Sequence, residues 1–303
     1  MKIIFKIILN IFIASSMLFM HSCSDGTDEE IRTVNKTQQK DSEDTGKAEH
    51  VRKILYSVPS HIEMIRLVKG SGIEFDKSIM NSPNQVANYN SVKSQAFNLG
   101  VYGTDLAYIS IFEQTQEVLN YFSAIKTLAD ELGVSNVIND KNIQRFERNI
   151  ENQDSLIVFI SEIFYSIDET LNEDERGYVS AIVVVGGWLE AMNIMTQNGM
   201  IMTGSNRDGI KKIIADQRHS LENIIELIKI YDNDDNLGDL LVKLEKLNLL
   251  YGELIIQEEN TTVNKNEETG KVVIGGDDKI EFSDELLEKI SQEIDSIRNY
   301  YVN

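Results

Sequence analysis

Cysteine, proline and tryptophan are scarce in this sequence of 303 residues, which holds one cysteine, two prolines and one tryptophan. A single thiol cannot form a disulfide within the chain, so a disulfide-stabilised scaffold is excluded. The two prolines, Pro59 and Pro83, both lie in the first third of the chain, which leaves the remainder free to form long uninterrupted helices. The shortages therefore favour a helical protein with a conventional hydrophobic core.

Positive charge is also in short supply. Lysines and arginines number 29 against 49 aspartates and glutamates, which gives a net charge of −20 at pH 7. A surface of this sign repels phosphate backbones, so we expect no nucleic-acid partner. The hydrophobic fraction of 42% is sufficient for a core, and the acidic balance says nothing about catalysis.

The first 22 residues have the pattern of a secretory signal peptide. Lys2 and Lys6 precede an apolar run over residues 7–20, and the only cysteine, Cys23, follows it directly. The segment Met20-His21-Ser22-Cys23 resembles a bacterial lipobox, in which the cysteine carries the lipid; Met20 and His21 differ from the usual residues. We expect Cys23 to be the lipid attachment site, and an uncleaved membrane anchor is the alternative.

Residues 23–49 are rich in charge and poor in large apolar side chains, which predicts an acidic flexible tether. Ser24-Asp25 and Asp28-Glu29-Glu30 resemble the acidic tract with which Bacteroidetes lipoproteins reach the outer membrane. An acidic linker without a sorting role is the alternative. We expect an outer-membrane lipoprotein that faces the periplasm or the cell surface, with a folded domain over residues 50–303.

The folded domain is expected to be all-α, a single bundle of about seven to nine helices. Apolar residues recur at helical spacing, and caps such as Ser60 with Glu63, Asn139 and Ser283 mark helix starts. Gly133, as a left-handed residue, and Gly199 are expected to close two of the helices. A small β-hairpin, formed by residues 271–274 and 279–282, is predicted before the C-terminal helix. The expected helices cover about 61–70, 76–80, 90–132, 139–152, 154–171, 173–197, 208–231, 237–257 and 283–301.

One of these helices is apolar on nearly every face. Between Tyr178 and Met195 the only charged residue is Glu190, and Gly186-Gly187 lies in the middle. Such a helix must be buried in a protein or in a bilayer. We expect the centre of a bundle, crossed near Gly186 by the helix that carries Gly100 and Gly103, with Trp188 buried beside the crossing.

Polar residues within these apolar helices are candidates for a pocket. Glu190 and Asn193 share one seam of the central helix, and Tyr102, Asp105 and Tyr108 lie on the helix predicted to cross it. A carboxylate that lines a pocket between helices would have a raised pKa. The alternative is that these are core residues satisfied by neighbours, with Glu190 bound to an arginine, lysine or tyrosine.

Sites for a metal or a cofactor are not indicated. Asp216, His219 and Glu222 share a helix face, but a di-iron bundle needs a second such set. The run from Asp232 to Asn236 begins like a calcium loop and then lacks the required glycine and glutamate. We therefore expect no bound metal, no cofactor and no catalytic residue.

The segment from Asn98 to Gly133, NLGVYGTDLAYISIFEQTQEVLNYFSAIKTLADELG, resembles a stretch of uncharacterised Bacteroidetes outer-membrane lipoproteins. That resemblance implies the location and the all-helical fold, and it transfers no site residue because the family has no assigned activity. The leading hypothesis is a non-enzymatic binding or interaction module, held at the membrane by its lipid, with an envelope protein or a small ligand as partner. The alternative is an envelope hydrolase or metal-dependent enzyme that uses buried carboxylates such as Glu190 and Asp105.

Overall fold

The computed structural model describes residue 46 and residues 48–55, 57–235, 237–257, 262–265, 272–275 and 279–303. The chain divides into two compact units, residues 1–50 and 51–303, and the second contains the helices and strands described below. The predicted signal peptide, Cys23 and most of the predicted tether lie outside the described residues. Ala48 and Glu49, the last residues of that tether, are helical.

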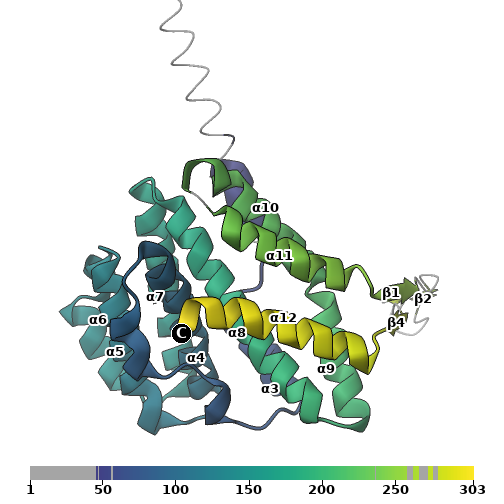
Figure 1. Cartoon of the computed structure of the whole chain (residues 1–303). Helices are drawn as coiled ribbons and strands as arrows, with labels where there is room; N and C mark the ends of the chain where they lie inside the picture. The colour runs from purple at the N-terminus through teal and green to yellow at the C-terminus, as the bar shows by residue number, and fades with distance from the viewer. Residues whose placement is uncertain are drawn as a thin grey trace, which may run out of the picture. The chain divides into compact units, whose positions relative to one another are not determined.

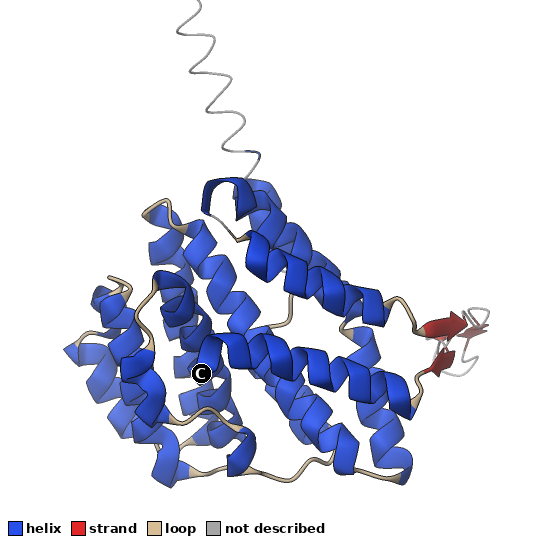
Figure 2. Ribbon diagram, in the orientation of Figure 1, coloured by secondary structure: helices blue, strands red, loops and turns tan. Residues whose placement is uncertain are grey.

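The described residues are mostly helical, as the all-α prediction requires (Figure 2). The α-helices are α3 (His61–Gly70), α4 (Val92–Ile111), α5 (Thr115–Glu131), α6 (Asp140–Asn149), α7 (Gln153–Glu173), α8 (Gly177–Ile201), α9 (Gly204–Asp216), α10 (Arg218–Asp235), α11 (Gly238–Tyr251) and α12 (Asp284–Val302). Short 3-10 helices cover Lys77–Ile79 (η1), Pro83–Asn88 (η2) and Ser135–Ile138 (η3). The ten α-helices between His61 and Val302 exceed the predicted seven to nine.

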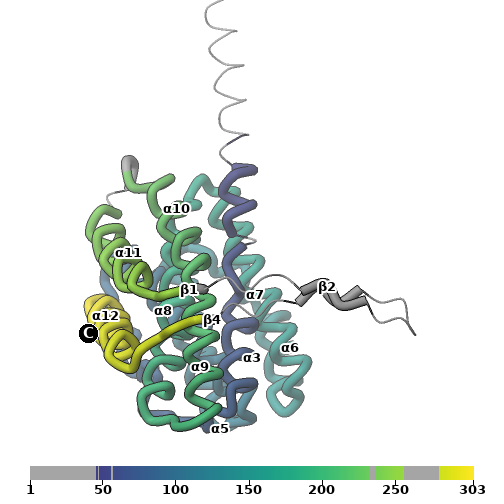
Figure 3. Tube along the Cα trace, turned by 90° about the vertical axis from the view of Figure 1, so that its right-hand side faces the viewer, coloured from purple at the N-terminus to yellow at the C-terminus, as the bar shows by residue number. Residues whose placement is uncertain are grey.

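Helix α8 is the centre of the bundle. It contacts α3, α4, α7, α9, α10 and α12, with α4 as its most extensive neighbour. Figures 1 and 3 show α8 between α11 and α12 on one side and α3 and α7 on the other. Among the described residues it is the one helix long and apolar enough to cross a membrane, yet 94% of its apolar window is buried within the protein. Its hydrophobicity is therefore accounted for by the core.

Several predicted helix ends are confirmed. The Ser60 side chain accepts from the Glu63 backbone N–H and the Glu63 carboxylate accepts from Ser60 N–H, which is the capping box expected at the start of α3. Asn139 and Ser283 cap α6 and α12. Gly133, with φ of 76°, follows the end of α5 as the predicted left-handed residue.

The predicted helix over residues 90–132 is wrong as a single element, because it breaks between Ile111 and Thr115. At the break Glu113 adopts φ of 60°, its N–H donates to Ser110 O, and Gln114 N–H donates to Ile109 O. This is the Schellman arrangement that ends helices, with glutamate where glycine is usual. Glu175, with φ of 58°, ends α7 in the same way, so the central helix starts at Gly177 and not near residue 173.

Three other boundaries differ from the prediction. The helix expected over 208–231 is split at Gln217, whose buried side chain accepts from the Trp188 indole N–H at 3.4 Å. Gly199 lies within α8 and does not close it, because the helix continues to Ile201. The helix expected over 237–257 ends at Tyr251, where the β-branched Ile255 and Ile256 favour a strand.

The strands form two antiparallel pairs and not the predicted hairpin. Strand β1 (Ile255–Gln257) pairs with β4 (Lys279–Glu281), and β2 (Thr262–Lys265) pairs with β3 (Val272–Gly275). The predicted pairing of 271–274 with 279–282 is therefore wrong. No strand was predicted at residues 262–265, whose β-branched Thr262 and Val263 belong to the segment that pairs with β3.

Candidate functional site

The crossing of α4 and α8 brings the candidate residues together. A Cβ added at Gly100 would lie 2.0 Å from the carbonyl oxygen of Val183, and one added at Gly186 would lie 2.1 Å from that of Phe97. Only glycine permits this approach of two backbones. The predicted crossing near Gly186 is confirmed, and Trp188 beside it is 2% exposed.

The other two glycines named for this crossing have different neighbours. Gly187 faces the imidazole of His61 on α3, and Gly103 faces the ring of Phe164 on α7. The Gly187 carbonyl still takes part, since it accepts from the Thr104 hydroxyl on α4 at 3.0 Å. Asp105 and Glu190 follow the crossing on their two helices, about one turn further along.

Glu190 is fully buried and pairs with Arg298 of α12. The guanidinium donates from Nη2 to Glu190 Oε1 at 2.9 Å and from Nε to Oε2, a two-point ion pair. Burial alone would lower the pKa of Arg298, but the Glu190 carboxylate outweighs it and raises that pKa. Each partner of this buried ion pair thus has its counterion and two hydrogen bonds in the core.

Asp105 is the second buried carboxyl, and it is in a different state. Its Oδ2 accepts from the Asn81 backbone N–H at 3.1 Å. Burial, and then the negative charge of Glu190, raise its pKa well above the usual range, despite the opposing effects of Arg298 and Asn81. Its surroundings therefore favour the protonated form of Asp105 over the carboxylate.

Protonation gives the Asp105 carboxyl a hydrogen that it can donate to a neighbour. As a carboxylate its Oδ1 atom, which is fully buried, would have no partner among the described residues. Once protonated, the carboxyl can donate to Glu190, and two carboxylates could not make that bond because neither has a hydrogen. Asp105, Glu190 and Arg298 thus form one buried network. In it the negative charge of Glu190 is balanced by the positive charge of Arg298, and the protonated Asp105 adds no charge.

The remaining candidates hold one segment of backbone. Residues 73–90, which we call the strap, connect α3 to α4 and contain η1 and η2. The Tyr102 hydroxyl donates to Ser82 O at 2.8 Å, and the Tyr108 hydroxyl donates to Glu74 O at 3.2 Å. Asn193 and Arg298 both donate to the Ile79 carbonyl, each at 3.4 Å.

All five predicted pocket residues, namely Tyr102, Asp105, Tyr108, Glu190 and Asn193, thus lie together, and their hydrogen bonds are made to the strap and to Arg298. Each is buried. Burial raises the pKa of Tyr102, with further contributions from Tyr89, and raises that of Tyr108 to about 12, so both phenols stay neutral. The arrangement fixes an irregular segment that cannot satisfy its own backbone groups.

Sequence reasoning missed three members of the network. Asn81 donates to the Tyr89 hydroxyl at 2.9 Å and to Asn98 Oδ1 at 3.1 Å, and Asn98 donates to the Tyr301 carbonyl at 2.7 Å. These bonds tie the strap to the last turn of α12. Arg298 was detectable, because it stands beside Ile294 and Ile297 on the apolar face of the last helix.

The structure does not bring together the residues that were considered in the sequence as metal ligands. His219 Nδ1 lies 3.2 Å from a Glu222 oxygen, but the histidine side chain is 82% exposed. The break at Gln217 separates Asp216 from both, on α9. Within the described part of the chain, no three histidine, cysteine, aspartate or glutamate side chains are grouped to hold a metal ion. Asn236 of the Asp232 run lies outside the described residues.

Comparison with known proteins yields no match: no family model, no curated protein and no solved structure matches this sequence. The function is therefore argued from the residues themselves.

Proposed function

We propose that this protein is a lipid-anchored component of the cell envelope that acts as a non-enzymatic binding or interaction module. The observation that carries the proposal is the state of Asp105 and Glu190. These are the carboxylates that the alternative hypothesis, an envelope enzyme, would use. Both are fully buried and engaged, one by Asn81 and Glu190, the other by Arg298.

A general acid or base must come within hydrogen-bond reach of a substrate. The strap contacts this site directly: Asn81 N–H donates to Asp105, and the Ile79 carbonyl accepts from Arg298, the partner of Glu190. The hydrogen bonds of Asp105 and the ion pair between Glu190 and Arg298 instead hold parts of the fold together. This assignment leaves binding, at some other part of the surface, as the activity that the domain supports best.

The anchor part of the proposal rests on the sequence. Cys23 follows an apolar run with a positive start, and the resemblance to Bacteroidetes lipoproteins implies the outer membrane. A tether of the length of residues 24–48 would hold the domain about 25–30 Å from the membrane, at roughly 5–6 Å × √n. The partner is then an envelope protein or a small ligand near that membrane.

The anchor is tested by metabolic labelling with palmitate. Wild-type protein should incorporate the label and partition into the detergent phase, whereas Cys23→Ala should do neither. A Cys23→Ala protein that keeps its acyl label would disprove the lipobox assignment.

The binding part is tested by incubating the purified full chain with a small-molecule extract of the cell envelope. Native mass spectrometry should recover a ligand of unchanged mass after prolonged incubation. Conversion of an extract component would instead favour the hydrolase, provided that Glu190→Gln and Asp105→Asn abolish the conversion while the exposed Glu169→Gln does not.

A further inference from the structure

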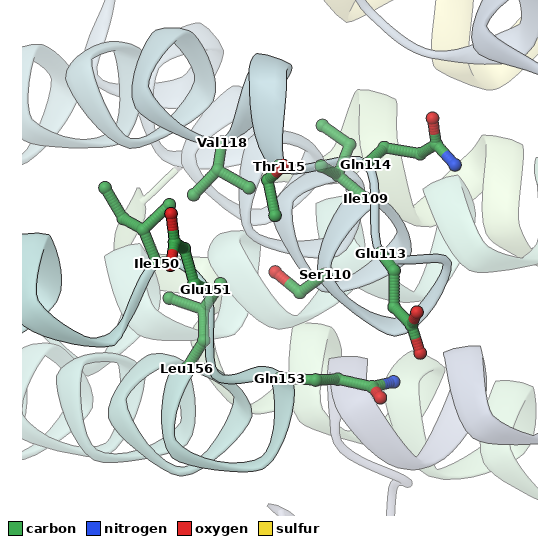
Figure 4. Close-up of a pocket in the computed structure, with 10 residues that line it drawn as sticks. All are labelled: Ile109, Ser110, Glu113, Gln114, Thr115, Val118, Ile150, Glu151, Gln153 and Leu156. Carbon is green, nitrogen blue, oxygen red and sulfur yellow. The ribbon is translucent and has the colours of Figure 1, made fainter.

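A cavity of about 390 Å³ lies where two helix junctions meet. One is the α4–α5 junction, and the other is the α6–α7 junction. This volume is within the range of small-molecule sites, which is about 300–1,000 Å³. Figure 4 shows its lining, which comprises Ile109, Ser110, Glu113, Gln114, Thr115, Val118, Ile150, Glu151, Gln153 and Leu156.

The apolar part of the lining comes from both junctions. Ile109 and Val118 belong to the first, and Ile150 and Leu156 to the second. Their side chains provide a surface on which a short aliphatic chain can be removed from water, at roughly 25 cal/mol per Å² of apolar area.

The polar part of the lining is rich in acceptors. The Gln153 amide donates to the Ile111 carbonyl at 3.0 Å, and the Gln114 amide donates to the Phe112 carbonyl at 2.9 Å. Because a carbonyl can only accept, these bonds fix each amide with its nitrogen toward the backbone. The amide oxygens, and the Ser110 hydroxyl that donates to Leu106 O, remain as acceptors.

The charge of the lining is negative. Glu113 and Glu151, both exposed to solvent, contribute two carboxylates at the mouth of the cavity, and the lining contains no lysine, arginine or histidine. Neither carboxylate takes part in a hydrogen bond or an ion pair with the residues that the structure describes. In Figure 4 the two acidic side chains lie on opposite sides of Ser110. Helix ends of both signs meet here, so their partial charges oppose one another. Lys69, outside the lining, donates to the same Ile111 carbonyl as Gln153, at 2.6 Å, and adds one positive charge against the two negative ones.

One of these acids occupies a strained backbone position. Glu113 occupies the left-handed region at φ of 60°, where glycine is favoured and other residues are strained by about 1–2 kcal/mol. The strained residue stands at the cavity, where its Cβ directs a carboxylate that glycine would lack. Strain of this kind clusters at binding sites.

We propose that this cavity binds a linear aliphatic diamine or polyamine, with an ammonium group at each carboxylate and the methylene chain against the apolar lining. The inference rests on the proposed binding function and names its ligand class. An ammonium carries three donors and no acceptor, which matches a lining of two carboxylates, two amide oxygens and a hydroxyl. The net charge of −20 would also raise the local concentration of such a cation.

Calorimetric titration of the full chain in detergent tests the proposal with three probes of similar length: 1,4-diaminobutane, n-butylamine and butane-1,4-diol. The diamine should bind, the monoamine should bind at least about tenfold more weakly, and the diol should give no heat. Affinity for the diamine should fall as salt rises from about 0.05 to 0.5 M. Equal affinity for diamine and diol, or no diamine binding at millimolar concentration, would overturn the assignment.

Site variants localise the binding. Glu113→Gln and Glu151→Gln keep the side-chain shape and should each weaken diamine binding about tenfold or more. The control is Glu169→Gln, which removes an exposed carboxylate elsewhere on α7 and should bind as wild type does. Diamine affinity that is equal in all three variants would place the binding outside this cavity.

The outcomes separate this inference from the proposed function. A chain that ignores the diamine but retains an unchanged ligand from the envelope extract would refute the cavity assignment and leave the binding function intact. A chain that binds the diamine at Glu113 and Glu151 and converts it chemically would keep the cavity and refute the non-enzymatic role.

Discussion

The guanidinium of Arg298 reaches from the last helix to Glu190 in the middle of the central helix, across 108 residues of sequence, and bonds both carboxylate oxygens. The same guanidinium donates to the Ile79 carbonyl of the strap. One side chain thus joins α8, α12 and the segment before α4. The network holds these three elements together. Because its charged groups are buried, the free energy of unfolding should depend strongly on keeping them paired.

Glu190→Gln should be strongly destabilising, since it leaves the Arg298 charge buried without its counterion. Removing one partner of a buried ion pair costs about 3–5 kcal/mol. Urea unfolding of the purified chain measures the change. The double variant Glu190→Gln/Arg298→Met should recover part of the loss, because it buries no unpaired charge. A single variant within about 0.5 kcal/mol of wild type would show that the pair is not desolvated.

Asp105→Asn should be tolerated, because asparagine reproduces a protonated aspartate. Its amide can donate to Glu190 and its oxygen can accept from Asn81. The raised pKa of Asp105 means that the folded protein holds a proton that the unfolded chain releases above its ordinary pKa. Wild-type stability therefore falls as pH rises through this interval, and Asp105→Asn lacks that loss.

The two proteins should consequently be similar in stability near pH 4, and Asp105→Asn should be the more stable at pH 8. Urea midpoints across this pH range provide the measurement. If Asp105→Asn were instead the less stable protein at pH 8, Asp105 would be an ionised partner of Arg298, and the assignment of its proton would be wrong.

Local signals predicted much of this fold. The caps at Ser60, Asn139 and Ser283 and the glycine at 133 act within one helical turn, so a single sequence displays them. The breaks at Glu113 and Glu175 have the same backbone geometry as Gly133 without its residue type, and no local pattern marks them. Two helices were merged at the first break for that reason.

The residues of the candidate site could be predicted from the sequence, but their role in the structure could not. Polar residues on apolar helices are visible in sequence, which is why Tyr102, Asp105 and Glu190 could be named. Their partner is the backbone of the strap, which has no periodicity and whose position depends on α4, α8 and α12 together. A sequence shows which groups must be satisfied, and tertiary structure decides what satisfies them.

Glycine substitutions test the crossing of α4 and α8. Gly186→Ala should destabilise by about 1–3 kcal/mol or more, because its Cβ would meet the Phe97 backbone, which cannot move aside. Gly187→Ala should cost less, since the atoms it meets belong to the His61 side chain. Gly187→Leu is larger and should also lower the melting temperature.

The control for these variants is Gly209→Ala on α9, where no atom lies within 4 Å of the added Cβ. It removes the helix penalty of glycine and should stabilise by up to about 1 kcal/mol. Thermal unfolding of the set measures the order. A Gly186→Ala protein that melts at or above the wild-type temperature would contradict the close approach of the two helices.

His61 should make the protein less stable in acid. Its Nε2 atom is buried without a hydrogen-bond partner among the described residues, and its ring lies 4.9 Å from that of Phe164. Burial lowers its pKa from 6.5 to about 4. Between these values the unfolded chain binds a proton that the folded protein does not, so stability falls as pH falls through that interval.

The full effect is about 3 kcal/mol between pH 7 and pH 4, at 1.36 kcal/mol per unit of pKa. Asp105 contributes the opposite slope in the same range, so the effect of His61 is best measured in the Asp105→Asn background. There, the stability of the His61 protein relative to a His61→Phe derivative should decline steadily as pH is lowered from 7 to 4. A stability difference between these two proteins that stays constant with pH would mean that the imidazole is solvated. The packing of His61 against Gly187 would then not exclude water from the ring.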